Sequence, residues 1–263
     1  MSIWNVAVGE CAGSRHRARG ECSADAFAYL EVGGDRVLAA VADGAGSAAM
    51  GAQVAKIAVD TAVSALEEAT DGFGSGIDLV WAATCDAVLW AVRAEIRRVA
   101  EEHGSAFDDF ATTLLFADCS GVGAGFGLVG DGGIAVRDDA NGISLPLAPM
   151  AGEFANETLF VTSNEGRVGP RVAWLDPVDA IAIFTDGIAP LAIDLASRAA
   201  HAPFFDPVFR LVGAEEAAQS TAQLQAFIES DRVDRRVDDD RTLLIAVRTP
   251  APTVQSGETE ENI

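Results

Sequence analysis

The sequence predicts an α+β domain in which antiparallel sheets are covered by helices. Short apolar runs that suit strands come in groups, two helical segments stand together between such groups, and strands do not alternate regularly with helices. A chain of 263 residues suits one large domain or two small ones, and neither a repeat nor a linker divides it. We therefore expect one domain over residues 1–248 and a disordered acidic tail over residues 249–263, which are rich in Pro, Ser and Glu.

The first elements follow from apolar spacing and turn residues. Residues 26–32 and 36–42 are apolar runs on either side of Gly-Gly-Asp, which predicts a β-hairpin. Apolar residues then recur at helical spacing over residues 47–69 and again over residues 78–103. Gly104 suits the end of the second helix, because glycine readily adopts the left-handed conformation found there.

The second half of the chain returns to strands. Short apolar runs predict strands over residues 111–118, 123–130, 133–138, 157–163, 179–186 and 241–247. Residues 190–230 are expected to be mostly helical, with a break at the Pro- and Phe-rich segment 201–207.

Charge and cysteine content exclude several classes of protein. The chain has 18 Lys and Arg against 40 Asp and Glu, a net charge of −22, so nucleic acid and anionic membrane are not expected as partners. No apolar stretch is long enough to span a bilayer, and the first residues lack the pattern of a signal peptide. The four cysteines are scattered and form no C-x-x-C pair, which indicates reduced thiols in a cytoplasmic protein.

Carboxylates stand where apolar runs end. Three such runs end in Asp-Gly, at Asp43, Asp131 and Asp186, and Asp239 and Asp240 precede the last predicted strand. Burying an ionised Asp costs several kcal/mol unless something compensates it. Mg²⁺ and Mn²⁺ take oxygen ligands, and the neighbouring glycines would let the main chain approach an ion. Asp-Gly is also a common turn dipeptide, so the pattern alone leaves open a set of ordinary turns.

The order of these motifs resembles that of a known family. The segments "CSADAFAYL", "VADGAGSAAMGAQVA", "FATTLLFA", "GLVGDGGIAV", "IFTDGI" and "DDRTLLIAV" occur in this order between Cys22 and Val247. Together they resemble the metal-dependent serine/threonine protein phosphatases of type 2C, most closely the compact bacterial branch. The resemblance implies two packed antiparallel sheets flanked by helices, a four-layer α-β-β-α sandwich, with a metal pair at one end.

The resemblance also implies a ligand set for two Mg²⁺ or Mn²⁺ ions. Asp43 would bridge both ions, and Gly44 would offer its carbonyl to one of them. Asp186 and Asp239 would complete the shell of the other ion, so Asp43, Asp186 and Asp239 would be the catalytic carboxylates. Asp240 competes for the role of Asp239, which fits the family pattern better. Water activated between the ions would attack phosphorus in line, without a covalent intermediate.

The remaining implied roles lie nearer the N-terminus and in the middle of the chain. Asp25 would hold a metal-bound water, and Asp131 would help to bind a third, weaker ion. An arginine upstream of Asp25 would grip the substrate phosphate, and we favour Arg19, then Arg17. The alternative for this basic segment is an exposed N-terminal turn without a role in binding.

Two positions depart from the family pattern. Ala45 replaces a histidine that many eukaryotic members use to protonate the leaving group, a contribution typically worth about 10²–10⁴-fold. Ala24 replaces a Glu or Gln that holds an outer-shell water. We expect hydrolysis of phosphoserine and phosphothreonine in a protein substrate, in signalling opposite a cognate kinase. The alternatives are a catalytically weak protein that binds a phosphoprotein or kinase, and a small-molecule phosphomonoesterase.

Overall fold

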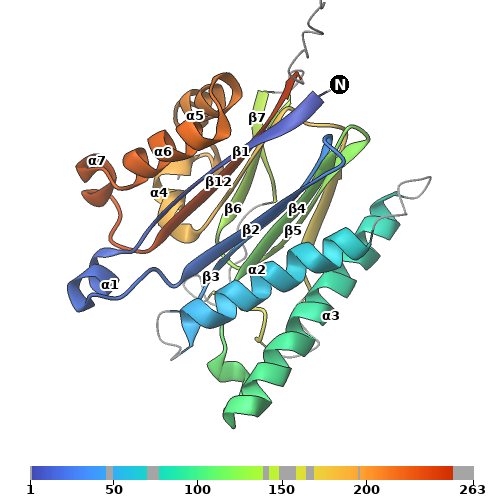
Figure 1. Cartoon of the computed structure of the whole chain (residues 1–263), viewed down its shortest axis with the longest axis vertical. Coiled ribbons are helices and arrows are strands. Elements are labelled where there is room, and N and C mark those ends of the chain that lie inside the picture. Colours follow the sequence, from blue (N-terminus) through green and yellow to red (C-terminus); the bar gives the residue numbers. More distant parts are fainter. Residues whose placement is uncertain are drawn as a thin grey trace, which may run out of the picture.

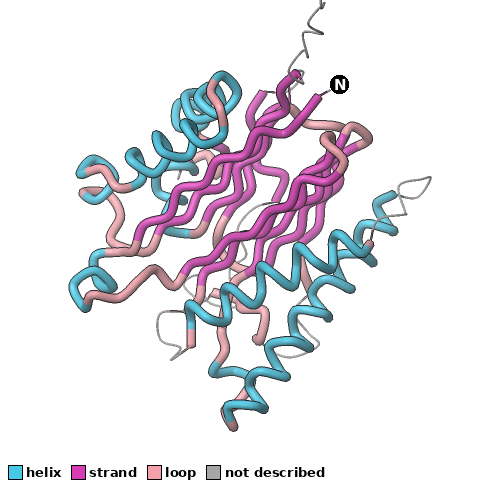
Figure 2. The backbone as a smooth tube through the Cα atoms, in the orientation of Figure 1, coloured by secondary structure: helices cyan, strands magenta, loops and turns pink. Residues whose placement is uncertain are grey.

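The structure, a computed structural model, describes residues 2–45, 50–69, 77–138, 142–147, 158–163, 169–194 and 196–250. These residues form four layers, with two antiparallel sheets in the middle and helices outside them (Figures 1 and 2). The architecture is the one expected, an α+β sandwich of helix, sheet, sheet and helix.

The first sheet has the strand order β1-β12-β9-β6-β7. Its strands are β1 (Ser2–Cys11), β12 (Arg241–Pro250), β9 (Ala180–Phe184), β6 (Gly133–Asp138) and β7 (Gly142–Leu147). The second sheet has the order β2-β3-β4-β5-β8. Its strands are β2 (Asp25–Val32), β3 (Arg36–Asp43), β4 (Leu114–Ser120), β5 (Gly123–Val129) and β8 (Arg171–Leu175).

Helices cover the outer face of each sheet. The second sheet is covered by α2 (Gly51–Glu68) and α3 (Ile77–His103), which lie along it in Figure 1. The first sheet is covered by the helices of the C-terminal half, which are α4 (Ala189–Ala192), α5 (Ala202–Ala214), α6 (Ala217–Ile228) and α7 (Asp231–Asp234). The short helix α1 (Ser14–Arg19) stands at one end of the sandwich, between β1 and β2.

The smaller elements lie in the connections. The 3-10 helices are η1 (Phe107–Asp109) and η2 (Asp186–Ile188), and a two-stranded ribbon consists of β10 (Ile193–Asp194) and β11 (Ala199–Ala200).

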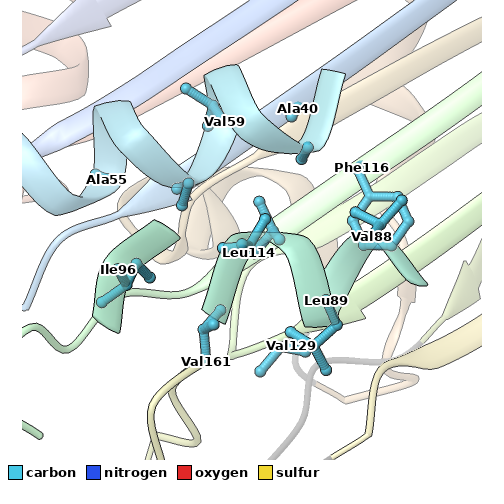
Figure 3. Packing of buried hydrophobic residues seen from close by; sticks show 14 of the residues in the cluster. Ala40, Ala55, Val59, Val88, Leu89, Ile96, Leu114, Phe116, Val129 and Val161 are labelled. Carbon is cyan, nitrogen blue, oxygen red and sulfur yellow. The ribbon is translucent and has the colours of Figure 1, made fainter. Parts of the chain in front are cut away.

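Three apolar cores separate the four layers. The core under α2 and α3 joins helix residues such as Val59 and Ile96 to sheet residues such as Phe116 (Figure 3). A second core lies between the sheets and includes Val41 and Ile183, and a third joins the first sheet to α5 and α6 through residues such as Phe209. Burial at about 25 cal/mol per Å² of apolar surface makes these cores the main favourable contribution to folding.

The first and last described strands are neighbours at one edge of the first sheet. β1 pairs with β12 along its whole length, from Ser2 opposite Pro250 to Cys11 opposite Arg241. β12 in turn pairs with β9 in antiparallel fashion. The segment before β12 and the segment after β9 therefore lie at the same end of the sheet.

Most predicted elements are confirmed. The hairpin of residues 26–32 and 36–42 corresponds to β2 and β3. The two helices correspond to α2 and α3, although residues 47–49 at the predicted start of α2 lie outside the described residues. Gly104 follows α3 with a φ of +65°, as expected for a helix end. No helix within the described residues is long and apolar enough to cross a bilayer.

Three local predictions were wrong. Residues 158–163 are not a strand, and residues 161–163 form a turn. The expected break at residues 201–207 is absent, because α5 begins at Ala202 and continues through Pro207. Pro203 lies in its first turn, where the missing N–H costs no helical hydrogen bond. The predicted tail begins too early, since Thr249 and Pro250 belong to β12, and residues 251–263 lie outside the described residues.

Candidate metal centre

Four strand ends bring aspartates to one end of the sandwich. Asp25 begins β2 and Asp43 ends β3, and the two residues are directly opposite in the antiparallel register. Asp186 follows β9 after one residue, and Asp239 precedes β12, which pairs with β9. Asp131 lies in the connection between β5 and β6. The topology therefore collects residues from nearly the whole length of the chain.

The charges of these carboxylates interact. Burial, followed by the negative charges of Asp186, Asp131 and Asp239, raises the pKa of Asp43 to about 8. Burial, followed by the charges of Asp131 and Asp239, raises the pKa of Asp186 to about 7. The pKa of Asp25 is raised well above its ordinary value by burial and then by the charge of Asp43. We call Asp25, Asp43, Asp131, Asp186 and Asp239 the acidic cluster.

Asp25 is a buried carboxylate with only one of its two oxygens in a hydrogen bond. Its side chain is buried, and its Oδ2 accepts a hydrogen bond from the Thr185 hydroxyl at 2.8 Å. Its Oδ1 is also buried but has no hydrogen-bond partner. A buried carboxylate oxygen without a partner loses its hydration and gains nothing in return. A divalent cation, or water held by one, would satisfy this atom.

The backbone of Asp43 is fixed by two threonines. The Asp43 N–H donates to Thr113 Oγ1 at 2.9 Å, and the Thr112 hydroxyl donates to the Asp43 carbonyl at 2.9 Å. The Thr113 N–H also donates to that carbonyl, at 2.9 Å. These bonds give Thr112 and Thr113 a supporting role, and they leave the Asp43 carboxylate for the cluster.

The two glycines beside these carboxylates are required by close packing. A Cβ at Gly44 would lie 2.1 Å from the Gly51 carbonyl oxygen, and a Cβ at Gly187 would lie 1.9 Å from the Asp240 carbonyl oxygen. Real Cβ atoms do not approach backbone this closely, so neither position tolerates a side chain. The main chain is therefore tightly packed around Asp43 and Asp186.

Asp239 and its neighbour Asp240 have different surroundings. Asp240 is buried, and its Oδ1 accepts bonds from the Gly13 N–H at 2.6 Å and is 2.8 Å from His16 Nδ1. Its Oδ2 accepts a bond from the Ala24 N–H at 2.6 Å. Asp240 is thus occupied in joining three parts of the chain, whereas Asp239 is exposed, although the charges of both raise the pKa of Asp186. This geometry favours Asp239 over Asp240 as a metal ligand.

Sequence reasoning missed the role of Asp240 and His16. The histidine stands in the run "RHR" among the candidate phosphate-binding arginines, and Asp240 was considered only as an alternative metal ligand to Asp239. Their contact joins positions 224 residues apart, and nothing local in the sequence indicates it.

The structure gives the two candidate phosphate-binding arginines different neighbours. The Arg17 guanidinium donates to the Ala12 carbonyl at 2.6 Å and to Asp234 at 3.0 Å. Arg19 is exposed, with its guanidinium 3.7 Å from a carboxylate oxygen of Glu21. The described contacts bring neither arginine to the acidic cluster, and a phosphate-binding role for them stays a prediction.

The donor set fits a hard divalent cation. It consists of carboxylate oxygens and nearby backbone carbonyls, which are the ligands that Mg²⁺ and Mn²⁺ prefer. Among the described residues, no three Asp, Glu, His or Cys side chains stand close enough to hold one ion as they are placed. Coordination of one ion by several of these carboxylates would therefore require side-chain rotation toward a shared cation.

Comparison with known proteins identifies the family. The model of the family described as protein phosphatase 2C matches residues 12–229, which include Asp25, Asp43, Asp131 and Asp186. The chain belongs to this family. Asp239 lies beyond the matched segment, so its assignment depends on its place beside Asp186 and Asp43.

Relatives of this phosphatase agree with the assignment. The chain is 36% identical over 212 residues to serine/threonine-protein phosphatase 3 of Escherichia coli (strain K12), which covers 79% of this chain and 82% of the relative. The structure of the serine/threonine phosphatase Stp1 from Staphylococcus aureus matches with a TM-score of 0.65 at 16% identity, over 93% of this chain and 95% of that one.

A further solved structure shares the fold. The catalytic domain of the serine/threonine protein phosphatase PstP, solved with two manganese ions, matches with a TM-score of 0.60 at 16% identity, over 95% of this chain and all of that one. Family membership makes this chain a metal-dependent phosphoprotein phosphatase, which requires a divalent cation. The resemblance stated from the sequence motifs is thereby confirmed.

Proposed function

We propose that the acidic cluster holds two Mg²⁺ or Mn²⁺ ions and that the phosphatase uses them to hydrolyse phosphoserine and phosphothreonine in proteins. The observation that carries this proposal is the acidic cluster itself, with the pKa of Asp43 raised to about 8 and a buried oxygen of Asp25 left without a partner. Such a cluster is costly for the apo protein and becomes favourable once cations neutralise it.

The roles divide according to position. Asp43 would hold both ions, with the carbonyl of Gly44 beside it, and the bonds to Thr112 and Thr113 keep its backbone in place. Asp186 and Asp239 complete the ligand set from neighbouring strand ends. Asp25 orients water beside the ions through its unpartnered oxygen, and Asp131 serves a third, weaker ion.

The chemistry follows from this arrangement. When bound, the ions lower the pKa of water so that hydroxide is available near neutral pH, and they neutralise charge on the phosphoryl oxygens. The protein positions the carboxylates, and no side chain serves as a nucleophile. Ala45 is buried and its N–H donates to the Ala111 carbonyl at 3.0 Å, so this position supplies no proton to the leaving alkoxide.

Replacement of one ligand tests the assignment. We expect Asp43→Asn to lower kcat for a phosphothreonine peptide with Mn²⁺ by about 10²–10³-fold or more, as loss of transition-state charge stabilisation does. Asp206→Asn is the matched control, because Asp206 is an exposed aspartate on α5 outside the cluster. If Asp43→Asn kept activity within tenfold of the wild type, the ligand assignment would be wrong.

Ala45 gives the proposal a second, independent test. An aryl phosphate needs little protonation of its leaving group, whereas a threonine alkoxide needs much. We expect kcat/KM to be higher for p-nitrophenyl phosphate than for a phosphothreonine peptide. Equal or reversed values would mean that another acid replaces the histidine that Ala45 lacks. Absence of turnover on both substrates, together with absence of Mn²⁺ binding by calorimetry, would favour a catalytically weak binding protein.

Arg19 remains the favoured phosphate-binding residue, with Arg17 second. The support is that Arg17 is occupied by Ala12 and Asp234, whereas Arg19 is exposed. Arg19→Ala should raise KM for the phosphopeptide about tenfold with little change in kcat. The exposed Arg15→Ala on the same helix is the control, and equal effects of both changes would show that the segment acts only through its general charge.

The substrate is expected to be a target of a cognate serine/threonine kinase, or the phosphorylated kinase itself, in the cytoplasm. All four cysteines are free, as a reducing compartment requires. The test is dephosphorylation of a kinase and its targets from the same cell, in the presence of Mn²⁺. If all of them stayed phosphorylated while the phosphopeptide was hydrolysed, the kinase would not be the counterpart.

A further inference from the structure

A pocket lies among the C-terminal helices, on the outer side of the first sheet. Its volume is about 810 Å³, and α4, α5, α6, α7 and the β10–β11 ribbon bound it. Figure 1 shows these helices on the side of the sandwich opposite to α2 and α3. No member of the acidic cluster lines the pocket. The volume is within the range of small-molecule binding sites, roughly 300–1,000 Å³.

The floor of the pocket is apolar. Leu191, Val208 and Leu224 line it as buried side chains, and Phe204 and Phe227 line it as half-buried rings. The centroids of the two rings are 6.1 Å apart. These walls present apolar surface to the cavity that no described side chain covers.

Two arginines give the pocket a charged edge. Arg232 is on α7, Arg236 follows four residues later, and both line the pocket and are exposed. Within the described part of the chain, neither guanidinium forms an ion pair or a hydrogen bond. This contrasts with Asp234 of the same helix, which binds both Arg17 and Arg241.

The other charged groups at the pocket do not neutralise these arginines. Asp194 lines the pocket, but its Oδ1 accepts hydrogen bonds from the N–H groups of Ala196 and Ser197 and from the Ser197 hydroxyl. His201 lines the pocket as well, and its imidazole carries no negative charge that could pair with the arginines. In a chain with 40 acidic and 18 basic residues, two unpaired arginines beside an apolar cavity are a specific feature.

We propose that this pocket binds an amphipathic monoanion, a carboxylate with a hydrocarbon body. The carboxylate would pair with Arg232 and Arg236, since guanidinium groups bind carboxylates through two parallel hydrogen bonds. The hydrocarbon body would cover Phe204 and Phe227 and gain about 25 cal/mol per Å² of apolar surface removed from water. A neutral apolar molecule would leave the arginines unpaired, and a small polar anion would leave the apolar floor in water.

The walls of the pocket are continuous with the metal centre. α4 begins three residues after Asp186, and Val237, two residues before Asp239, packs with Leu191 and Val233 in a small apolar cluster. A ligand in the pocket would therefore contact the segments that carry two of the acidic residues. The binding itself does not depend on catalysis, so it can be measured on the Asp43→Asn variant as well as on the wild type.

Titration calorimetry with decanoate tests the proposal. We expect decanoate to bind to the intact protein with a sub-millimolar Kd, and 1-decanol, which has the same chain without the charge, to bind at least tenfold more weakly. The double change Arg232→Gln and Arg236→Gln should weaken decanoate binding by tenfold or more. Gln223→Trp, a change at an exposed position on α6 that lines the pocket, should weaken it without altering the charge.

The matched control removes the same charge elsewhere. Arg210 and Arg235 are exposed and do not line the pocket, so Arg210→Gln with Arg235→Gln should leave the Kd for decanoate within twofold. The proposal is overturned if decanoate does not bind, if 1-decanol binds equally well, or if the control weakens binding as much as the change at Arg232 and Arg236. A circular dichroism spectrum confirms that each variant is folded.

Discussion

Asp239 and Asp240 are neighbours in sequence, but they do different things. Asp240 accepts hydrogen bonds from the backbone of Gly13 and Ala24 and contacts His16, so it links β12 to the segments on both sides of α1. Asp239 is exposed, and its negative charge, like that of Asp240, raises the pKa values of Asp43 and Asp186. Asp240 therefore links segments of the fold around the proposed site, and Asp239 is left available as a ligand.

This difference gives a paired prediction. Asp240→Asn should lower the free energy of unfolding by about 1.5–3 kcal/mol, because it weakens hydrogen bonds to a charged group. Asp239→Asn should leave that free energy unchanged or raise it, while kcat with Mn²⁺ falls by about 10²-fold or more. Urea denaturation in EDTA and phosphopeptide turnover measure the two effects. A large loss of stability from Asp239→Asn would contradict the division of roles.

The raised pKa values of Asp43 and Asp186 predict how stability depends on pH. Their folded values are about 8 and about 7, whereas an unfolded Asp titrates near about 3.9. Between these values the folded protein binds more protons than the unfolded chain, so stability must fall as pH rises. The loss is largely complete once the pH passes the folded pKa values.

We therefore expect the unfolding free energy in EDTA to decrease by roughly 1–3 kcal/mol from pH 5 to pH 8. Asp43→Asn should flatten this dependence, and saturating Mn²⁺ should also reduce it because the cation replaces the protons. Urea denaturation at several pH values measures the change. Constant or rising stability over this range in EDTA would show that the carboxylates do not repel one another as described.

At the scale of elements, β5 has glycines where aromatic rings pack directly against its backbone. A Cβ at Gly123, Gly125 or Gly127 would lie 2.3, 2.5 or 2.2 Å from the ring of Trp174, Trp81 or Phe116, respectively. These glycines alternate along the strand and so face one side of the sheet, which α3 covers. Trp81 of α3 also donates its indole N–H to the Phe126 carbonyl of β5 at 3.0 Å. Of these rings only Trp81 belongs to α3, so Gly125 is the position where β5 fits against the helix only without a side chain.

Gly125→Ala should lower the free energy of unfolding by about 1–3 kcal/mol, since it overpacks the contact with Trp81. Gly169→Ala is the control, because a Cβ there would meet no atom within 4 Å. Thermal or urea unfolding distinguishes them. Equal stability of the two variants would mean that the ring of Trp81 moves aside without cost.

The same scale shows how much of the fold the sequence predicted. Elements with strong local patterns were predicted correctly, such as the β2–β3 hairpin and α3. β1 was missed although Trp4, Val6 and Val8 alternate with other residues, because its only described partner, β12, is more than 200 residues away. The apolar residues of segment 157–163 suggested a strand, but Val161 instead packs against α3 and β4 residues in the first core.

The metal centre could be predicted only where its residues have a local pattern in the sequence. Asp43, Asp131 and Asp186 each end an apolar run before glycine, which is a local signal. The bonds of Asp240 to Gly13 and Ala24 join positions more than 200 residues apart, and no local pattern encodes them. The engagement of Arg17 with Asp234 was hidden in the same way.

For the whole molecule, the contacts at the end of β12 define where the domain ends. Arg248 donates two hydrogen bonds from one nitrogen to the Asp35 carboxylate, at 2.8 and 3.0 Å, and a further bond to Ser2. Pro250 is the last paired residue, opposite Ser2. We therefore propose that the folded domain extends to Pro250, two residues beyond the boundary expected from composition.

A chain that ends at Pro250 should keep the melting temperature and the activity of the full chain within error. A chain that ends at Val247 loses the bonds of Arg248 and the last pairs with β1, and its free energy of unfolding should fall by about 2 kcal/mol or more. Scanning calorimetry of the two truncations measures this. If removal of residues 251–263 destabilised the protein, the domain would extend beyond β12.

The place of β12 between β1 and β9 also has a consequence for synthesis in the cell. A ribosome releases residues in order, and Asp239 and β12 come after all the other members of the acidic cluster. Until Asp239 and β12 leave the ribosome, β1 and β9 lack the strand that lies between them. Asp25, Asp43 and Asp186 then also lack Asp239, the last member of the acidic cluster. We therefore expect a nascent chain to lack phosphatase activity until this region has been translated.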